Sequence, residues 1–89
     1  MTTLNLGNLA TFRLVVQIEA FLKITETGSF SAAADALGIS QPAVSLQVRQ
    51  LEQFLQTRLL ERTGRGIKAT AAGMALLAHS EQIDRAVNS

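Results

Sequence analysis

The segment 29–56 most constrains the fold, because it contains two short helical patterns separated by a three-residue turn. The alanine-rich stretch SFSAAADAL favours a helix from Ser29, whose hydroxyl can cap the first turn, to about Leu37. In the turn GIS that follows, glycine allows a positive φ, isoleucine can plug the junction and serine caps the next helix. Pro42 then suits a first helical turn, where its missing N–H removes no intrahelical hydrogen bond. The pattern predicts a helix-turn-helix.

The second of these helices, expected from Gln41 to about Gln56, has one apolar face and one polar face. The apolar positions step by four, three and four residues: Val44, Val48, Leu51 and Leu55. In helix-turn-helix proteins the N-terminal half of the second helix enters the major groove of DNA. We therefore expect base contacts from Gln41, Pro42, Ser45 and Leu46, and a phosphate or guanine contact from Arg49. Pro42 could equally be a simple helix starter.

The region before this motif is expected to be helical from Leu9 to about Thr27, with Gly28 as its stop. Two apolar triplets recur in it with the same spacing, Leu9-Phe12-Val15 and Ile18-Phe21-Ile24, displaced by nine residues. Nine residues are about two and a half helical turns, so one continuous helix would point the triplets in opposite directions. Either the helix is buried on two faces or the chain breaks between the triplets.

The region after the motif combines a predicted hairpin with most of the positive charge. Two short apolar runs flank the turn-prone TGRG, which predicts a two-stranded wing over residues 59–69. Residues 45–70 carry a net charge of +3, although the 89-residue chain carries only +1. We expect Arg62, Arg65 and Lys68 to follow a DNA backbone, with Arg65 able to enter the minor groove. Ser31, at the start of the earlier helix, suits another phosphate.

A last helix is predicted from Thr70, which can cap it, to the end of the chain. Its seam steps by three and four residues and is expected to pack on the domain or on a second copy as a dimerisation face: Gly73, Leu76, Ser80, Ile83 and Val87.

Composition excludes several classes of function. A chain of 89 residues supports one domain, its longest apolar run is five residues, and no secretory signal is recognisable, so we expect a cytoplasmic protein without a membrane segment. Without cysteine it has no disulfide or thiolate metal site. The lone His79 lacks the partners of a metal or catalytic site and is expected to face solvent. We expect no enzyme activity, catalytic residue, metal or cofactor.

The stretch from GSF through SQPAVS, Leu51–Glu52, LLER and the Thr70-x-x-Gly73 pair resembles the N-terminal domain of the LysR-type transcriptional regulators. The resemblance covers residues 18 to about 89 and implies a mainly α winged helix-turn-helix at 1–69, with residues 1–14 as an extension, and a linker/dimerisation helix at 70–89. It also implies a homodimer bound to double-stranded DNA at an inverted repeat. A small-molecule effector would act only through a further domain that this chain does not include.

Several positions depart from the family pattern, and one of them keeps an alternative open. Leu46 stands where a basic or polar residue is common, so a charge contact is lost, although leucine could still touch a thymine methyl. With the small net charge, this leucine favours the alternative, a winged-helix protein-protein interaction or dimerisation module.

Overall fold

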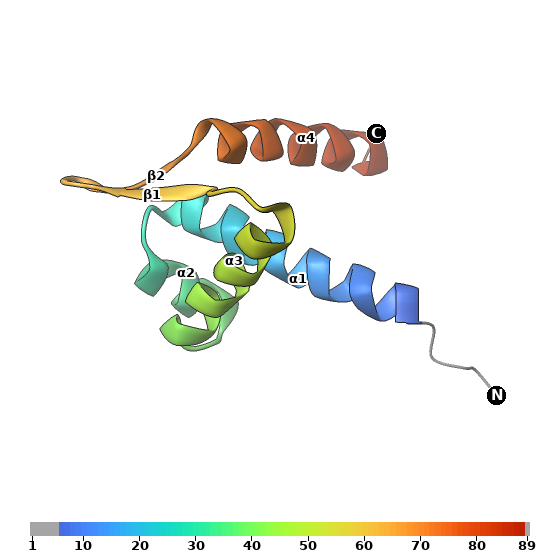
Figure 1. The fold of residues 1–89 in the computed structure, drawn as a ribbon, viewed down its shortest axis with the longest axis horizontal. Coiled ribbons are helices and arrows are strands. Elements are labelled where there is room, and N and C mark those ends of the chain that lie inside the picture. The colour runs from blue at the N-terminus through green and yellow to red at the C-terminus, as the bar shows by residue number, and fades with distance from the viewer. Residues whose placement is uncertain (1–5, 89) are drawn as a thin grey trace.

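The computed structural model describes the backbone of residues 6–88 and the side chains of residues 9–80. Three helices precede a hairpin and a last helix (Figure 1), in the order α1 (Leu6–Thr27), α2 (Phe30–Leu37), α3 (Gln41–Leu55), β1 (Leu60–Thr63), β2 (Gly66–Ala69) and α4 (Ala71–Asn88). This arrangement confirms the predicted mainly α winged helix-turn-helix with its two-stranded wing and its last helix.

The core lies where α1, α2 and α3 meet. Its largest fully buried side chains come from α1, α3 and the segment before β1: Phe21, Ile24, Val44, Leu51 and Leu59. The small buried residues Ala33 and Ala34 let α2 approach the other two helices closely. The buried positions of α3 match the predicted stripe except at Leu55, which is exposed, because the helix ends there with Gln56 in the left-handed conformation.

The N-termini of α2 and α3 are capped by the predicted serines. The Ser29 hydroxyl accepts from the backbone N–H of Ala32 at 2.9 Å, and the Ser40 hydroxyl accepts from that of Ala43 at 3.2 Å. Gly38 adopts φ 70°, and Ile39 donates its backbone N–H to the carbonyl of Ala34 at 3.1 Å. The expectation that the Ile39 side chain plugs the junction is wrong, because it is 43% exposed.

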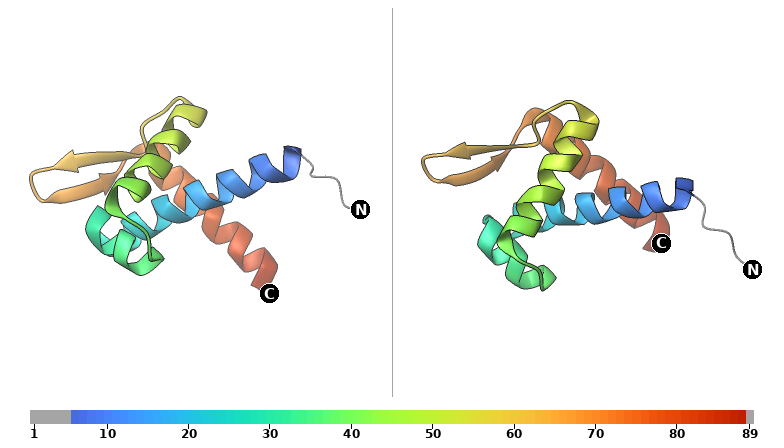
Figure 2. Two further views of the ribbon diagram at one scale, coloured as in Figure 1. Left: turned by 90° about the horizontal axis from the view of Figure 1, so that it is seen from below. Right: turned by 60° about the horizontal axis from the view of Figure 1, so that its bottom comes forward.

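Helix α1 is continuous from Leu6 to Thr27, so the chain does not break between the two triplets. The second triplet packs in or against the core, as its two fully buried members Phe21 and Ile24 show. The first triplet is exposed, with Phe12 66% accessible. The alternative of two buried faces is therefore also wrong within this chain, because the N-terminal half of α1 extends past the helical body (Figure 2).

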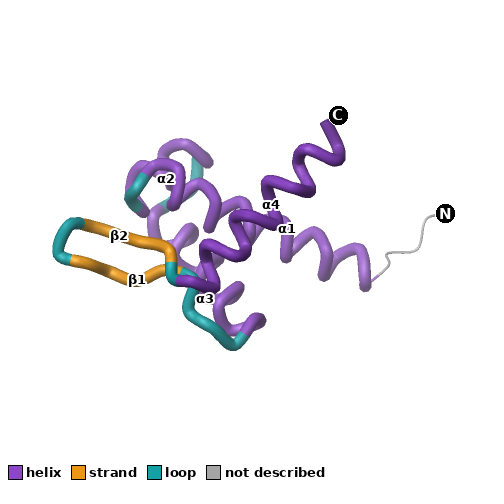
Figure 3. Tube along the Cα trace, turned by 90° about the horizontal axis from the view of Figure 1, so that it is seen from above, coloured by secondary structure: helices purple, strands orange, loops and turns teal. Residues whose placement is uncertain are grey.

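The wing is a hairpin that projects from the body (Figure 3), with β1 antiparallel to β2 and Leu60 paired with Ala69 at its base. Alternation along the strands places Arg62 and its partner Ile67 on one face, and Glu61 and its partner Lys68 on the other. The two faces of the hairpin therefore carry different charged groups.

Candidate nucleic-acid interface

The outer face of α3 carries the residues that sequence reasoning assigned to base contacts. Val44, Val48 and Leu51 bury the inner face, so Gln41, Pro42, Leu46 and Arg49 are exposed and Ser45 is half-buried. Leu46 is 46% accessible on this otherwise polar face. The helical period predicted from the apolar stripe thus explains which side chains are free.

An open groove of about 620 Å³ separates α3 from the wing. Its α3 side includes Ser45, Arg49 and Glu52, and its wing side includes Arg58 and Arg62. Arginine is suited to bidentate contacts with phosphate, and here it lines both walls. With Glu52 and Glu61 as its acidic members, the groove joins the helix face to the hairpin in one surface that carries three arginines.

Glu52 fixes the hairpin relative to α3, a role that sequence reasoning missed. Its carboxylate accepts hydrogen bonds from the backbone N–H groups of Leu59, at 2.7 Å, and Leu60, at 3.2 Å. The guanidinium Nε of Arg58 lies 3.7 Å from the same oxygen, and the Glu52 side chain is only 17% exposed. Helical spacing placed Glu52 away from the apolar stripe but gave no signal that a segment seven residues later folds back onto it.

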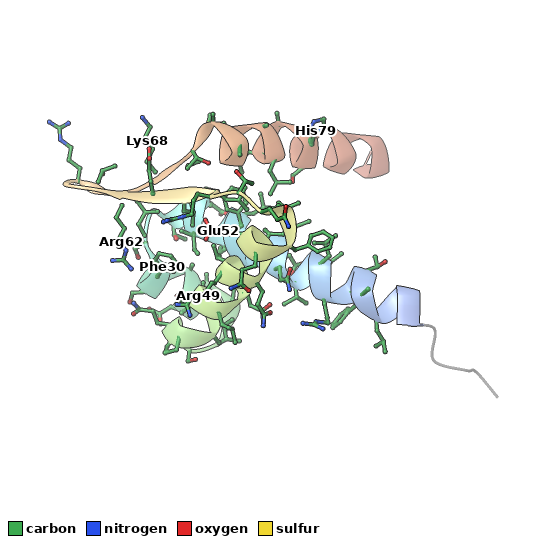
Figure 4. The ribbon with its side chains drawn as sticks, in the orientation of Figure 1. Phe30, Arg49, Glu52, Arg62, Lys68 and His79 are labelled. Atoms are coloured by element: carbon green, nitrogen blue, oxygen red, sulfur yellow. The ribbon has the colours of Figure 1, made fainter. Side chains whose placement is uncertain are left out.

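The three wing cations predicted as one group are separated by the structure. Arg62 points toward α2, where its guanidinium carbon lies 5.6 Å from the centroid of the Phe30 ring (Figure 4). Lys68 points away from that side and lies on the other face of the hairpin, where it pairs with Glu61 of the neighbouring strand. Arg65 lies in the turn between the strands and is exposed. Only Arg62 of the three lines the groove.

Ser31, the remaining predicted phosphate ligand, lies in the first turn of α2 and is exposed. It follows Phe30 directly, so it lies beside the point where the wing arginine meets α2. The structure thus brings a hydroxyl and a guanidinium to the same end of α2, although the sequence assigned them to separate elements.

The first predicted dimerisation residue is engaged within its own chain. Gly73 is buried, and an added Cβ would clash with the carbonyl oxygen of Leu59 and lie 3.2 Å from the Cβ of Ala69. Gly73 is therefore corrected from a dimer contact to a close contact between α4 and the base of the wing. Leu76 packs partly against the core and Ser80 is half-buried. The side chains of Ile83 and Val87 lie outside the described residues.

Thr70 completes this junction as the cap of α4. Its hydroxyl donates to the carbonyl of Arg58 at 2.6 Å and accepts from the backbone N–H of Gly73 at 3.1 Å. Its own N–H donates to the carbonyl of Leu59 at 2.9 Å. The segment 58–60 is consequently held by α3 on one side and by the start of α4 on the other.

Metal sites and membrane spans each require features that the described part of the chain does not show. Residues 9–80 contain no cluster of three or more His, Cys, Asp or Glu side chains able to hold a metal ion. His79 is exposed on α4 (Figure 4), as predicted. None of the described helices is both long and apolar enough to span a bilayer.

The fold and this arginine-lined groove define a winged helix-turn-helix protein with a candidate nucleic-acid interface. Comparison with known proteins gives the family, since the bacterial regulatory helix-turn-helix proteins of the lysR family match residues 15–74, and the chain belongs to that family. The match begins inside α1, so residues 6–14 of that helix precede it.

Individual relatives agree with this assignment. An uncharacterised HTH-type transcriptional regulator from the ibpB-leuC intergenic region of Azotobacter vinelandii is 46% identical over 69 residues, covering 78% of this chain and 48% of that protein. The nitrogen assimilation regulatory protein nac of Escherichia coli strain K12 is 45% identical over 69 residues, covering 78% and 23%. The chain thus spans half or less of these curated relatives.

Solved structures with the same fold include two protein–DNA complexes. The DNA-binding domain of CbnR in complex with DNA superposes with a TM-score of 0.71 at 40% identity, covering 81% of this chain and 83% of that chain. The DNA-binding domain of BenM with catB site 1 DNA superposes with a TM-score of 0.73 at 35% identity, covering 81% and 80%.

Proposed function

We propose that this chain binds double-stranded DNA sequence-specifically, as the DNA-binding part of a transcriptional regulator. The observation that carries the proposal is the exposed outer face of α3 beside an arginine-lined groove and a projecting wing. In this arrangement α3 enters the major groove and the wing follows the backbone and the minor groove. The solved DNA complexes of CbnR and BenM support the same use of the fold.

Base discrimination falls to the N-terminal half of α3. The Gln41 amide can bond N6 and N7 on the major-groove edge of an adenine, and the Ser45 hydroxyl reaches a base or a phosphate. Pro42 and Leu46 offer apolar contact to thymine methyl groups, and Arg49 suits a guanine or a phosphate. These side chains can touch base edges because the burial of Val44 and Val48 turns them outward.

Affinity falls mainly to the cations around this helix. Arg62 in the groove, Arg65 at the hairpin turn and Lys68 on the other hairpin face can neutralise phosphates at different places along a duplex. Ser31 adds a neutral phosphate contact at the end of α2. The net charge of +3 over residues 45–70 supports this division between positioning and readout.

A homodimer bound to an inverted repeat is the assembly we propose, with Leu76, Ser80, Ile83 and Val87 of α4 as its dimerisation face. The three- and four-residue spacing of these positions supports this dimerisation face. Gly73 is not included, because it contacts Leu59 of its own chain. A small-molecule effector would bind a domain outside this chain. We also propose that the regulator works in the cytoplasm and that it catalyses no reaction.

Selection of duplexes from a random pool tests the proposal and defines the site together. We expect enrichment of an inverted repeat that the chain then shifts in a gel-retardation assay. The double variant Arg62→Ala, Arg65→Ala should lose the shift while its circular dichroism spectrum keeps the helical signal. Folded wild-type protein that shows no preference among duplexes at low salt would refute sequence-specific binding.

A protein-interaction module is the second candidate, favoured by the exposed apolar side chains Leu46 on α3 and Phe12 on α1. It predicts equal affinity for selected and random DNA, together with a defined helical partner that binds the purified chain. Substitution of Leu46 by Glu would then abolish partner binding. If the chain binds DNA instead, the same change should lower its affinity for the duplex.

A further inference from the structure

We propose that Phe30 is a positioning residue for the interface: its ring holds the Arg62 guanidinium in the groove, ordered in advance for a DNA backbone phosphate. The inference rests on the proposed DNA-binding function and deepens it. Neither α2 nor the wing could place this arginine alone, because the contact joins residues that are 32 positions apart in the chain.

The ring is a fixed platform. Phe30 is the first residue of α2, which is capped by Ser29, and its side chain is half-buried and packs against the core. The guanidinium carbon of Arg62 lies 5.6 Å from the ring centroid, inside the roughly 6 Å range of cation–π attraction. The contact with this fixed ring therefore restricts the rotamers of the exposed Arg62 side chain, whereas an isolated surface arginine would sample many rotamers.

The contact leaves the arginine free to bind an anion. A cation–π contact uses none of the guanidinium N–H groups as a hydrogen bond to an oxygen acceptor, so these donors keep their capacity to bind an anion. Within residues 9–80 the ion pairs join Lys23 to Glu26 and Arg58 to Glu52, and neither includes Arg62. The adjacent Glu61 also lines the groove, but within the same residues it forms no ion pair with Arg62.

The surroundings indicate a phosphate as the occupant. Phe30 and Arg62 line the same groove as Arg49 and Ser45 of α3, and Ser31 is exposed next to the ring. A duplex that inserts its major groove onto α3 brings a backbone strand alongside this groove. An arginine ordered before binding loses less side-chain entropy when the phosphate arrives, and this raises affinity without adding a contact.

A double-mutant cycle on DNA binding tests the inference, with the full chain and its selected duplex measured by fluorescence anisotropy at several salt concentrations. Arg62→Ala should lower the steepness of the salt dependence by about one unit, as expected for one lost phosphate contact. Phe30→Leu should weaken binding about two- to fivefold, the equivalent of an exposed cation–π contact. In the Arg62→Ala background, Phe30→Leu should cause no further loss. With Arg62 present, Phe30→Tyr keeps the aromatic ring and should bind with wild-type affinity.

The matched control is Phe54→Leu, the same substitution at a 68% exposed phenylalanine on α3 that lies outside this groove, and it should leave affinity unchanged. Equal losses from Phe30→Leu in both backgrounds, or no loss in either, would overturn the inference. Wild-type protein that binds no duplex would instead refute the DNA-binding function.

The stack can also be tested in the free protein, which keeps the inference falsifiable if Phe30→Leu does not fold. In the wild type, ring currents should shift the Arg62 side-chain protons upfield in NMR spectra, and Phe30→Tyr should preserve the shift. Arg62 protons at ordinary positions in the folded wild type would overturn the inference independently of any DNA measurement.

Discussion

At the scale of single residues, helical periodicity predicted exposure well and tertiary contacts poorly. The four-and-three spacing of Val44, Val48 and Leu51 was enough to place Gln41 and Arg49 on the free face of α3. No local pattern could show that the Glu52 carboxylate binds the backbone of Leu59, because that contact depends on where the chain returns after α3.

Removal of the Glu52 carboxylate should therefore be costly. Glu52→Ala leaves two backbone N–H groups near the core without their acceptor, and we expect a loss of about 2 kcal/mol in the free energy of unfolding. Urea unfolding followed by circular dichroism measures it. Glu61→Ala, at an exposed wing position, is the matched control and should change stability by less than about 0.5 kcal/mol. Similar values for the two variants would contradict the anchoring role of Glu52.

Two residues of α3 should separate base readout from charge. Gln41→Ala should relax the base preference at one position of the selected site, at a cost of about 1–3 kcal/mol there, and leave the salt dependence unchanged. Arg49→Ala should weaken binding to all duplexes and lower the salt dependence by about one unit if its partner is a phosphate. Binding titrations over several salt concentrations on matched and single-mismatch duplexes distinguish them. A Gln41→Ala protein with unchanged base preference would exclude Gln41 from readout.

At the scale of elements, the order and type of helices and strands followed from capping residues and apolar spacing, but the relations between elements did not. The spacing of Gly73 and Leu76 fits a seam for a partner helix equally well as a contact with the wing. The structure decides for the wing at Gly73, because only a residue without a side chain lets α4 approach the Leu59 carbonyl. The continuity of α1 was likewise undecidable, since an exposed apolar triplet has no signature in the sequence.

Substitution of this glycine should reverse the usual effect of helix propensity. In an open helix interior, Gly→Ala stabilises by up to about 1 kcal/mol. Gly73→Ala should instead lower the free energy of unfolding, by about 1–2 kcal/mol, because the new Cβ meets the backbone of Leu59. Thermal unfolding of Gly73→Ala and of the exposed-site control Ala75→Gly should show that both lower the melting temperature. A rise in melting temperature for Gly73→Ala would show that the contact at the base of the wing is loose.

At the scale of the whole molecule, the fold gathers a charge that the net value conceals. Residues 1–44 and 71–89 each carry −1, and the +3 segment between them forms α3 beyond its first turn and the wing. The positive potential is therefore concentrated at the proposed DNA surface, which favours association with a polyanion although the chain as a whole is nearly neutral. Helix α4 begins at the base of that surface and extends away from the wing (Figure 1), so the assembly of two copies through α4 would determine the spacing of two such surfaces.

The proposed dimerisation face of α4 gives the last prediction, because its first residue, Leu76, also packs in part against its own domain. Leu76 and Leu77 pack against the core, so a chain cut after Ser80 keeps these contacts and loses only residues 81–89, which include Ile83 and Val87. In sedimentation velocity we expect the full chain to show a concentration-dependent dimer and the cut chain to remain a monomer with the same helical fold. On DNA, the cut chain should bind an inverted repeat no more tightly than a single half-site, because two linked modules gain affinity only while they are joined. Dimers of undiminished strength in the cut chain would place the dimer contact elsewhere, and the exposed apolar face of α1 around Phe12 would be the next surface to substitute.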